Sequence, residues 1–191
     1  MAKNLSTATP RVVQRIIAVL QAKLAEELPL VGAPQQLYIP APHNNAYYSI
    51  PEEARLGEPM PHNSAVYVYP SAIRRTIQRR LQGPSEYSST TEIGIACVLA
   101  FRMAPQDVFE FFNKTITTAE IMQLRAHYYN AAIIETLLKY AINPDDINDL
   151  ILEEEQGAVS FVEGRELGGV AFTSWTITQD TRLPVPQLGA V

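Results

Sequence analysis

Two stretches of the chain repeat their apolar residues at the three- and four-residue spacing of an amphipathic helix. The first begins at Thr9, a good N-cap residue, and stops before Pro29. The second begins at Thr118 and ends at the pair Asn143-Pro144, because the residue before a proline disfavours helical backbone. We therefore expect two long helices that each bury one face. The expected stripes are Val12, Val13, Ile16, Ile17, Leu20 and Leu24, and then Ile121, Leu124, Tyr128, Ala131, Ala132, Leu138 and Ala141.

Alternation with a period of two predicts strands elsewhere in the chain. It is clearest at residues 92–102, where bulky apolar residues alternate with small or polar ones. We expect the small face of this strand to receive a packed helix. Residues 65–69 predict another strand, rich in Val and Tyr and closed by Pro70. Residues 159–162 and 170–178 predict a C-terminal antiparallel hairpin.

The remaining segments lack a clear period. Residues 30–63 hold six prolines and three tyrosines, so we expect an insertion or a contact arm, with a short edge strand at Leu37–Ile39. The polar and basic stretch 71–89 is compatible with a short helix. Residues 107–112 suggest an apolar turn or short helix. Residues 182–191 look like a tail that is free or lies on a neighbour.

This order of elements favours an α+β fold over a doubly wound parallel sheet, because strands and helices do not alternate regularly. We expect a mostly antiparallel sheet packed by two long helices on one face, with a Pro-rich insertion arm and a C-terminal β-hairpin. The 191 residues, 47% of them apolar, are enough for one domain with a substantial core. We therefore predict a single α+β domain over residues 1–191.

Composition restricts the class of protein further. The formal net charge of -5 argues against a dedicated duplex-binding module, which needs clustered cations. The single cysteine, Cys97, cannot close an intrachain disulfide and fits a reducing compartment. No apolar run approaches the length of about 18 residues that a membrane span needs, and the N-terminus lacks a signal-peptide pattern. We expect a soluble protein without a membrane partner.

The sequence offers no recognisable catalytic, cofactor or metal motif. No nucleophile elbow, phosphate-binding loop or dinucleotide fingerprint occurs. His43, His62 and His127 lack the spacing of a zinc site, and residues 145–149 lack the pattern of a calcium loop. Cys97 lies in an alternating apolar strand, where it predicts a buried structural residue. We expect a protein that is not an enzyme and holds neither cofactor nor metal.

Charge is concentrated in two segments of opposite sign. One segment carries four arginines within seven residues, Arg74, Arg75, Arg79 and Arg80. The other, residues 145–155, carries six carboxylates and includes Glu153, Glu154 and Glu155. If the two patches lie on opposite sides of the fold, identical subunits attract head to tail, and such a contact can close into a ring. The alternatives are a hydrated surface and, for the arginines, a nucleic-acid contact.

Four segments together resemble the tail terminator, or tail completion, proteins of long-tailed bacteriophages. They are the helix RVVQRIIAVLQAKL, the strand TEIGIACVLAF, the helix MQLRAHYYNAAIIETLLKY and the hairpin AVSFVEGRELGGVAFTSWTIT. The resemblance implies a subunit of a hexameric ring that caps the tail tube and joins it to the head-side neck or connector. The arm of residues 30–63 departs from the smallest members of that family.

The resemblance also implies partners and a location. The partners are other copies of this chain, the tail tube protein, the head-side connector protein and, where the tail has a sheath, the sheath protein. The location is a virion neck that is assembled in the host cytoplasm, and DNA passes through it without specific recognition. Tyr38, Tyr47 and Tyr48 are candidate arm contacts, since tyrosine is enriched at interfaces; core packing is their other role. The alternatives are another neck or connector ring protein, or a nucleic-acid-associated protein that uses residues 74–80.

Overall fold

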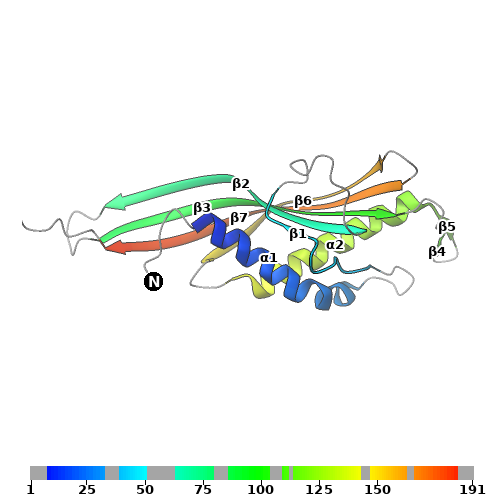
Figure 1. Cartoon of the computed structure of the whole chain (residues 1–191), viewed down its shortest axis with the longest axis horizontal. Helices are drawn as coiled ribbons and strands as arrows, with labels where there is room; N and C mark the ends of the chain where they lie inside the picture. The colour runs from blue at the N-terminus through cyan, green and yellow to red at the C-terminus, as the bar shows by residue number, and fades with distance from the viewer. Residues whose placement is uncertain are drawn as a thin grey trace, which may run out of the picture.

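The computed structural model describes residues 8–32, 39–50, 63–79, 86–103, 109–111, 114–142, 147–162 and 166–184. The helices are α1 (Ala8–Glu27), the short 3-10 helix η2 (Leu28–Val31) and α2 (Thr118–Tyr140). The strands are β1 (Tyr47–Tyr48), β2 (Ser64–Arg79), β3 (Glu86–Met103), β4 (Phe109–Phe111), β5 (Lys114–Ile116), β6 (Asp149–Val162) and β7 (Glu166–Pro184). Figure 1 shows how they are arranged.

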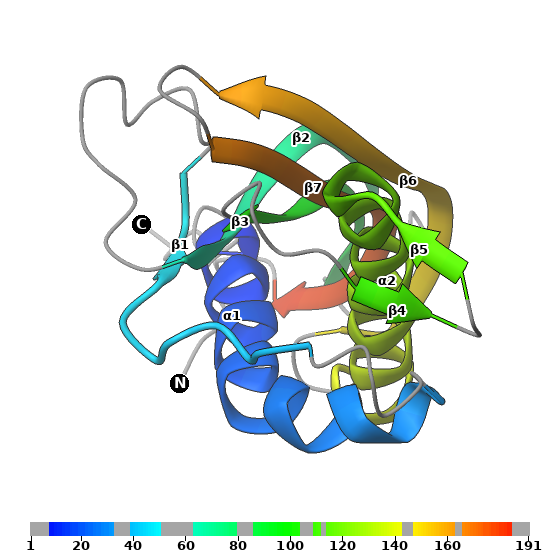
Figure 2. The same ribbon diagram turned by 90° about the vertical axis from the view of Figure 1, so that its right-hand side faces the viewer.

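Five strands form one sheet in the order β1-β2-β3-β7-β6, and two helices pack on it. Every pairing in this sheet is antiparallel except that of the short strand β1 with β2. Seen from one end, the strands arch over α1 and α2, which lie side by side (Figure 2). The predicted α+β class, with two helices on a mostly antiparallel sheet, is therefore confirmed.

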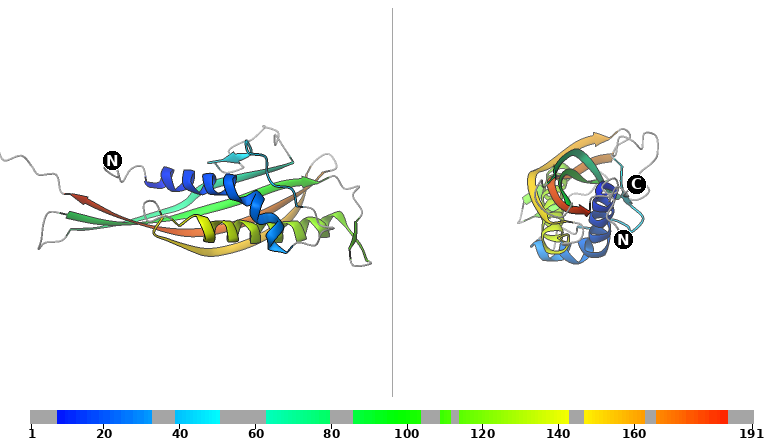
Figure 3. Two further views of the ribbon diagram at one scale, coloured as in Figure 1. Left: turned by 90° about the horizontal axis from the view of Figure 1, so that it is seen from below. Right: turned by 90° about the vertical axis from the view of Figure 1, so that its left-hand side faces the viewer.

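The sheet is longer than the helices that cover it. β2, β3 and β7 continue past the N-terminal end of α1 (Figures 1 and 3). The pairing stays regular in this extension, as far as Arg79 opposite Tyr87 and Glu86 opposite Pro184. Part of the sheet therefore extends without either helix beneath it.

The helix boundaries follow from local chemistry. The backbone N–H of Thr117 donates to the Glu120 carboxylate at 2.6 Å, and the Glu120 N–H donates to Thr117 Oγ1 at 3.3 Å. This capping box satisfies two backbone donors that have no partner within the helix. The N-cap of α2 is thus Thr117, so the prediction of Thr118 was wrong by one residue.

The core lies between the helices and the bulky face of β3. Ile93, Ile95, Cys97, Leu99 and Phe101 share one buried cluster with the apolar stripe of α1 and with residues of α2 that include Ile121, Tyr129, Ile133 and Leu137. Leu138, expected in the buried stripe of the second helix, is 47% exposed, so that part of the expectation was wrong. Smaller residues on the other face, Val98 and Ala100, belong to a separate buried cluster around Tyr67. The prediction that the small face receives a helix was therefore wrong. The larger side chains face the helices because more apolar area is buried there.

β2 does not stop at Pro70, and the basic stretch after it is not a helix. The strand continues to Arg79 through a bulge between Pro70 and Ala72. Gly94 on β3 makes room for this bulge: a Cβ there would lie 2.8 Å from Ser71 Oγ. Proline is tolerated at the edge of a sheet, where its missing N–H costs no ladder hydrogen bond.

Further expectations needed correction. Residues 109–111 form strand β4 rather than a turn or helix, and the acidic residues 149–155 lie in strand β6, which the sequence did not predict there. The predicted C-terminal hairpin has longer strands, and β7 continues into the expected tail as far as Pro184. Pairing across the whole sheet supplies these residues with backbone partners that local patterns do not reveal.

Part of the Pro-rich segment is attached to the core. The Tyr129 hydroxyl donates to the carbonyl oxygen of Pro40 at 2.6 Å, and the Val66 N–H donates to that of Ala46 at 2.8 Å. Ile39, expected in an edge strand, is not in a strand. The rest of that expectation, Leu37 and Tyr38, lies outside the described residues, as does 51–62.

The C-terminal ends of the two helices are joined by a buried carboxylate. Glu27 Oε2 lies 2.7 Å from Lys139 Nζ, and the Tyr140 hydroxyl donates to Glu27 Oε1 at 3.0 Å. Only 3% of the Glu27 side chain is exposed. The hydrogen bond from Lys139, followed by that from Tyr140, lowers the pKa of Glu27, although burial opposes the shift. The ionised carboxylate is therefore favoured in the folded state.

Because the folded pKa of Glu27 is lowered, its contribution to stability is present above the ordinary glutamate pKa. We expect that contribution to be lost as the pH falls through the lowered folded pKa. Thermal melting between pH 7 and pH 3 should show a steeper acid-induced loss for the natural chain than for Glu27→Gln, which cannot ionise. Glu135→Gln, an exposed partner of the same lysine, is the control. Identical pH profiles for the natural chain and Glu27→Gln would contradict the prediction.

Candidate functional site

The arginine-rich segment lies on the outer strand β2, beyond the bulge. Arg74 and Arg75 are exposed and stand opposite Glu92 and Thr91 of β3. The Arg75 guanidinium donates to Thr91 Oγ1 at 3.4 Å. Arg79 closes the strand, where the structure describes its backbone, and Arg80 lies outside the described residues. The described part of the segment is thus a strand with two exposed cationic side chains.

The glutamate run lies on the other outer strand, β6. The register moves from Leu152 opposite Trp175 to Glu154 opposite Ser174, so Glu153 is the extra residue of a β-bulge. Glu153, Glu154 and Glu155 are all exposed. The Glu154 carboxylate accepts a hydrogen bond from the Gln156 side chain. The run is therefore part of a strand at the edge of the sheet.

The order of strands separates the two charged segments. β3 and β7 lie between β2 and β6, so the arginines and glutamates occupy opposite edges of one sheet. Among the described residues, no ion pair joins one segment to the other. The fold therefore keeps them apart, which is the arrangement that head-to-tail attraction between copies requires.

Each of these edges is covered over part of its length. β1 pairs with β2 only at Val66 and Tyr67. On the other edge, Gln123 and Asn130 of α2 donate to the carbonyl oxygens of Gly157 and Gln156, at 3.2 and 2.7 Å. Gly157 permits this approach, since a Cβ there would lie 3.2 Å from the Ala126 Cβ. The charged half of each edge is the half that this chain leaves uncovered in its described part.

Exposed apolar side chains accompany the charges, and sequence reasoning missed them. Ile73, which precedes the two arginines, is 55% exposed. Ile151 and Leu152, which precede the three glutamates, are 47% and 36% exposed. The available signal on β6 was a run of two apolar residues followed by three like charges, and on β2 it was a single isoleucine before two arginines. Both edges therefore combine apolar area with charge, as interfaces do.

The candidate arm tyrosines make contacts within the chain. Tyr48 stacks on Tyr67 of β2, with ring centroids 5.4 Å apart. Tyr47 packs against the main core, and burial raises its pKa to about 12. Tyr38 lies outside the described residues. The described tyrosines thus attach the arm to β2, in keeping with the core-packing alternative.

Titratable and nucleophilic groups do not converge in the described part of the chain. Cys97 is fully buried, and burial raises the pKa of its thiol to about 12, opposed by a hydrogen bond involving Thr173. The described residues contain no cluster of three or more His, Cys, Asp or Glu that could hold a metal ion. His43 accepts from the Asn45 N–H, His127 is exposed on α2, and His62 lies outside the described residues.

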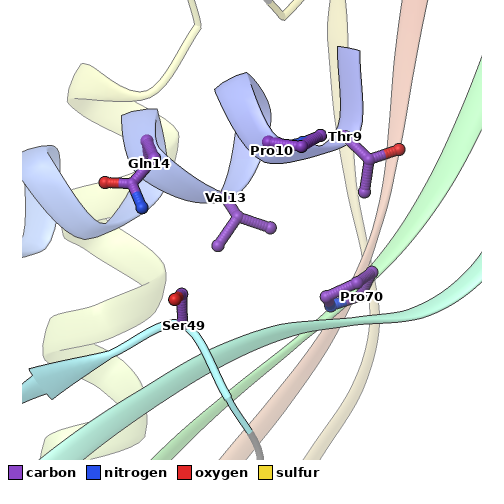
Figure 4. Close-up of a pocket in the computed structure, with 6 residues that line it drawn as sticks. All are labelled: Thr9, Pro10, Val13, Gln14, Ser49 and Pro70. Carbon is purple, nitrogen blue, oxygen red and sulfur yellow. The ribbon is translucent and has the colours of Figure 1, made fainter. Parts of the chain in front are cut away.

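A small hollow lies between α1, the arm and the bulge of β2. Its volume is about 240 Å³ (Figure 4). It is lined by Thr9, Pro10, Val13, Gln14, Ser49 and Pro70. None of these side chains ionises, so the hollow offers shape and a few hydrogen-bonding groups rather than acid–base chemistry.

Comparison with known proteins identifies no family for this chain. No model of a protein family matches the sequence, and no curated protein matches it significantly. Among the described helices, neither combines the length and the apolar character that crossing a membrane demands. The opposed charged edges are accordingly the strongest functional feature of the described structure.

Proposed function

We propose that this chain is a structural virion protein, a tail terminator whose copies form a ring on the tail tube of a long-tailed bacteriophage. One observation carries the proposal: the basic and acidic segments lie on opposite edges of the same sheet. Such a subunit presents two different, complementary surfaces to its two neighbours. Contacts of this type generate closed rings or open filaments rather than two-fold dimers.

The fold supports the proposal at the level of architecture. The segments that resemble the terminator family are a helix, a central strand, a second helix and a closing pair of strands, and the chain contains these elements in that order. A ring subunit works through complementary surfaces and needs no converging catalytic groups. In this proposal the Pro- and Tyr-rich segment 30–63 is an added contact arm, with the tube or a sheath protein as its partner.

The same geometry weighs against the main alternative, a nucleic-acid-associated protein. A phosphate-binding surface gains affinity from cations, whereas Glu153, Glu154 and Glu155 occupy the opposite edge of this sheet. Another neck or connector ring would use the same edges, so it differs from a terminator only in what the ring binds above and below. Binding to tail tubes is therefore the property that separates these two proteins.

Mass photometry and negative-stain microscopy test the proposal directly. We expect the purified chain to form rings at low ionic strength and, mixed with isolated tail tubes, to cap one end of each tube and block further polymerisation. Rings that do not bind tail tubes would indicate another neck protein. A monomer that neither forms rings nor caps tubes would overturn the proposal. Filter binding of DNA across a salt series would reveal the nucleic-acid alternative by a steep loss of affinity with salt.

A further inference from the structure

The uncovered edges of the sheet carry backbone groups as well as charged side chains. In the described part of the chain, no strand pairs with the outer side of β2 beyond Tyr67, or with the outer side of β6. The outer side of a strand that has no neighbouring strand is a template for a further strand. Within the described residues, the lengths without a neighbouring strand are 68–79 on β2 and 149–155 on β6, the latter just before the residues that accept hydrogen bonds from α2.

Strand directions make these two edges compatible. β2 is antiparallel to β3, β3 to β7, and β7 to β6, so β2 and β6 run in opposite directions. A rotation about a ring axis along the strands preserves their direction from one copy to the next. β2 of one copy therefore meets β6 of its neighbour in antiparallel orientation, which is the pattern already present throughout β2, β3, β7 and β6.

We propose that β2 of each copy pairs with β6 of the next copy through main-chain hydrogen bonds, so that the sheet continues around the ring. This inference rests on the proposed ring function and names the contact that builds it. The occupant of each edge is a second copy of this chain, because the two open edges carry opposite charge, Arg74 and Arg75 on one and Glu153 to Glu155 on the other.

Charge and side-chain faces together select a register. Through the strand pairings, Arg74 lies in the same row of the sheet as Thr178, and Glu154 lies in the same row as Ser174. Both rows have their side chains on the face of the sheet away from the helices. Pairing Arg74 with Glu154 of the neighbour keeps every side chain on a matching face. It places Thr76 opposite Ile151, and it sets Arg75 beside the bulge at Glu153. The exposed Ile151 is then partly covered by the next copy.

The same register allows the sheet to close into a ring. It displaces each copy by four residues along the strands, the step from Thr178 to Ser174, for every four strands crossed. Four residues span about 14 Å and four strands about 19 Å, which tilts the strands by about 35° to the ring axis. Closed sheets usually tilt by about 35–45°. A ring built from these four strands of each copy, with both helices on one side of the sheet, therefore has a strand tilt within the range of known closed sheets.

Disulfide cross-linking tests the register. In the variant Thr76→Cys/Ile151→Cys, the two new thiols face each other across the junction, where directly opposite Cβ atoms are about 4.5–5.5 Å apart. We expect mild oxidation, followed by alkylation and non-reducing electrophoresis, to give a ladder that ends at the number of copies in the ring. The native Cys97 can stay, because it is fully buried.

Three control variants define the outcome. Thr76→Cys alone and Ile151→Cys alone should give no cross-link; a covalent dimer from either would mean that like edges pair, which overturns the inference. The variant Thr76→Cys/Glu135→Cys should also give no ladder, because residue 135 is exposed on α2 and is not part of the proposed β2–β6 contact. A ladder from that pair would show random collision.

The failures of the two proposals are distinguishable. Rings seen by mass photometry without a ladder from Thr76→Cys/Ile151→Cys would overturn the strand pairing and leave the ring function standing. A ladder from a protein that does not cap tail tubes would support the strand pairing and overturn the terminator function. A chain that stays monomeric at all concentrations, alone and with tubes, would overturn both.

Discussion

Reversing Arg74 and Arg75 to glutamate should weaken association between copies by at least about a hundredfold. The change places glutamates of one copy against Glu153, Glu154 and Glu155 of the next, and like charges juxtaposed at an interface cost several kcal/mol. About 1.4 kcal/mol corresponds to a tenfold change in affinity. The measurement is the protein concentration at which half of the chains are assembled, by mass photometry at fixed low ionic strength.

The rescue variant makes this prediction specific to the charged edges. Adding Glu153→Lys, Glu154→Lys and Glu155→Lys to the Arg74→Glu/Arg75→Glu chain restores opposite signs across the junction, so assembly should partly recover. The fold should survive in each variant, because all five side chains are exposed, and circular dichroism checks this. Salt should weaken assembly of the natural chain through screening. An assembly midpoint that neither the reversal nor the rescue moves would remove the charge argument.

Substituting Gly169 with valine should destabilise the fold by about 1–3 kcal/mol, the usual cost of overpacking a core. Gly169 of β7 stands opposite Phe101 of β3, and a Cβ there would lie 2.3 Å from Phe101 Cζ. The ring has little space to withdraw, because Phe101 is only 4% exposed and its centroid lies 5.2 Å from that of Tyr129. Equilibrium unfolding in denaturant gives the free energy.

Two comparisons separate overpacking from a general effect of valine in a strand. Ala158→Val, at an exposed position of β6, should change the free energy of unfolding by less than about 0.5 kcal/mol. In a Phe101→Leu background the smaller side chain makes room, so the cost of Gly169→Val should fall, and a double-mutant cycle measures the coupling. Equal costs of Gly169→Val in both backgrounds would show that the contact with Phe101 is not the cause.

The helices were predictable because their signals are local. The apolar spacing of α1 and the stop before Pro29 appear directly in the sequence, and α1 ends at Glu27 as that pattern predicts. The pattern did not predict that α1 includes Ala8, ahead of the expected cap Thr9, or that the 3-10 helix η2 continues through Pro29 to Val31. The start of α2 was displaced by one residue, because Thr117 and Thr118 can both cap. Only the hydrogen bonds with Glu120 show that Thr117 does so.

The strands were predictable in the middle and not at their ends. The alternation at 92–102 identified the centre of β3, whereas the long polar ends of β2, β3 and β7 carry no apolar period. Those ends are strands because each finds a backbone partner beside it. The bulge at Pro70 illustrates the point, since it depends on Gly94, which is 24 residues away in sequence.

The candidate site was likewise predictable from the sequence only in part. The signs and positions of the two charged segments are properties of the sequence, and so is the prediction that they attract if they are separated. Their separation depends on strand order, which places β3 and β7 between Arg74 and Glu154. The exposed Ile73, Ile151 and Leu152 became visible only once pairing had shown which strands lie at the edges.

By itself, the sequence determined two amphipathic helices, a central apolar strand and two blocks of opposite charge, because spacing and charge act over a few neighbouring residues. The tertiary structure alone decided which face of the sheet receives the helices and which strands lie at its edges. It also decided which halves of those edges the chain covers with β1, Gln123 and Asn130. These choices depend on contacts between residues far apart in sequence, where packing and backbone pairing outweigh local preference.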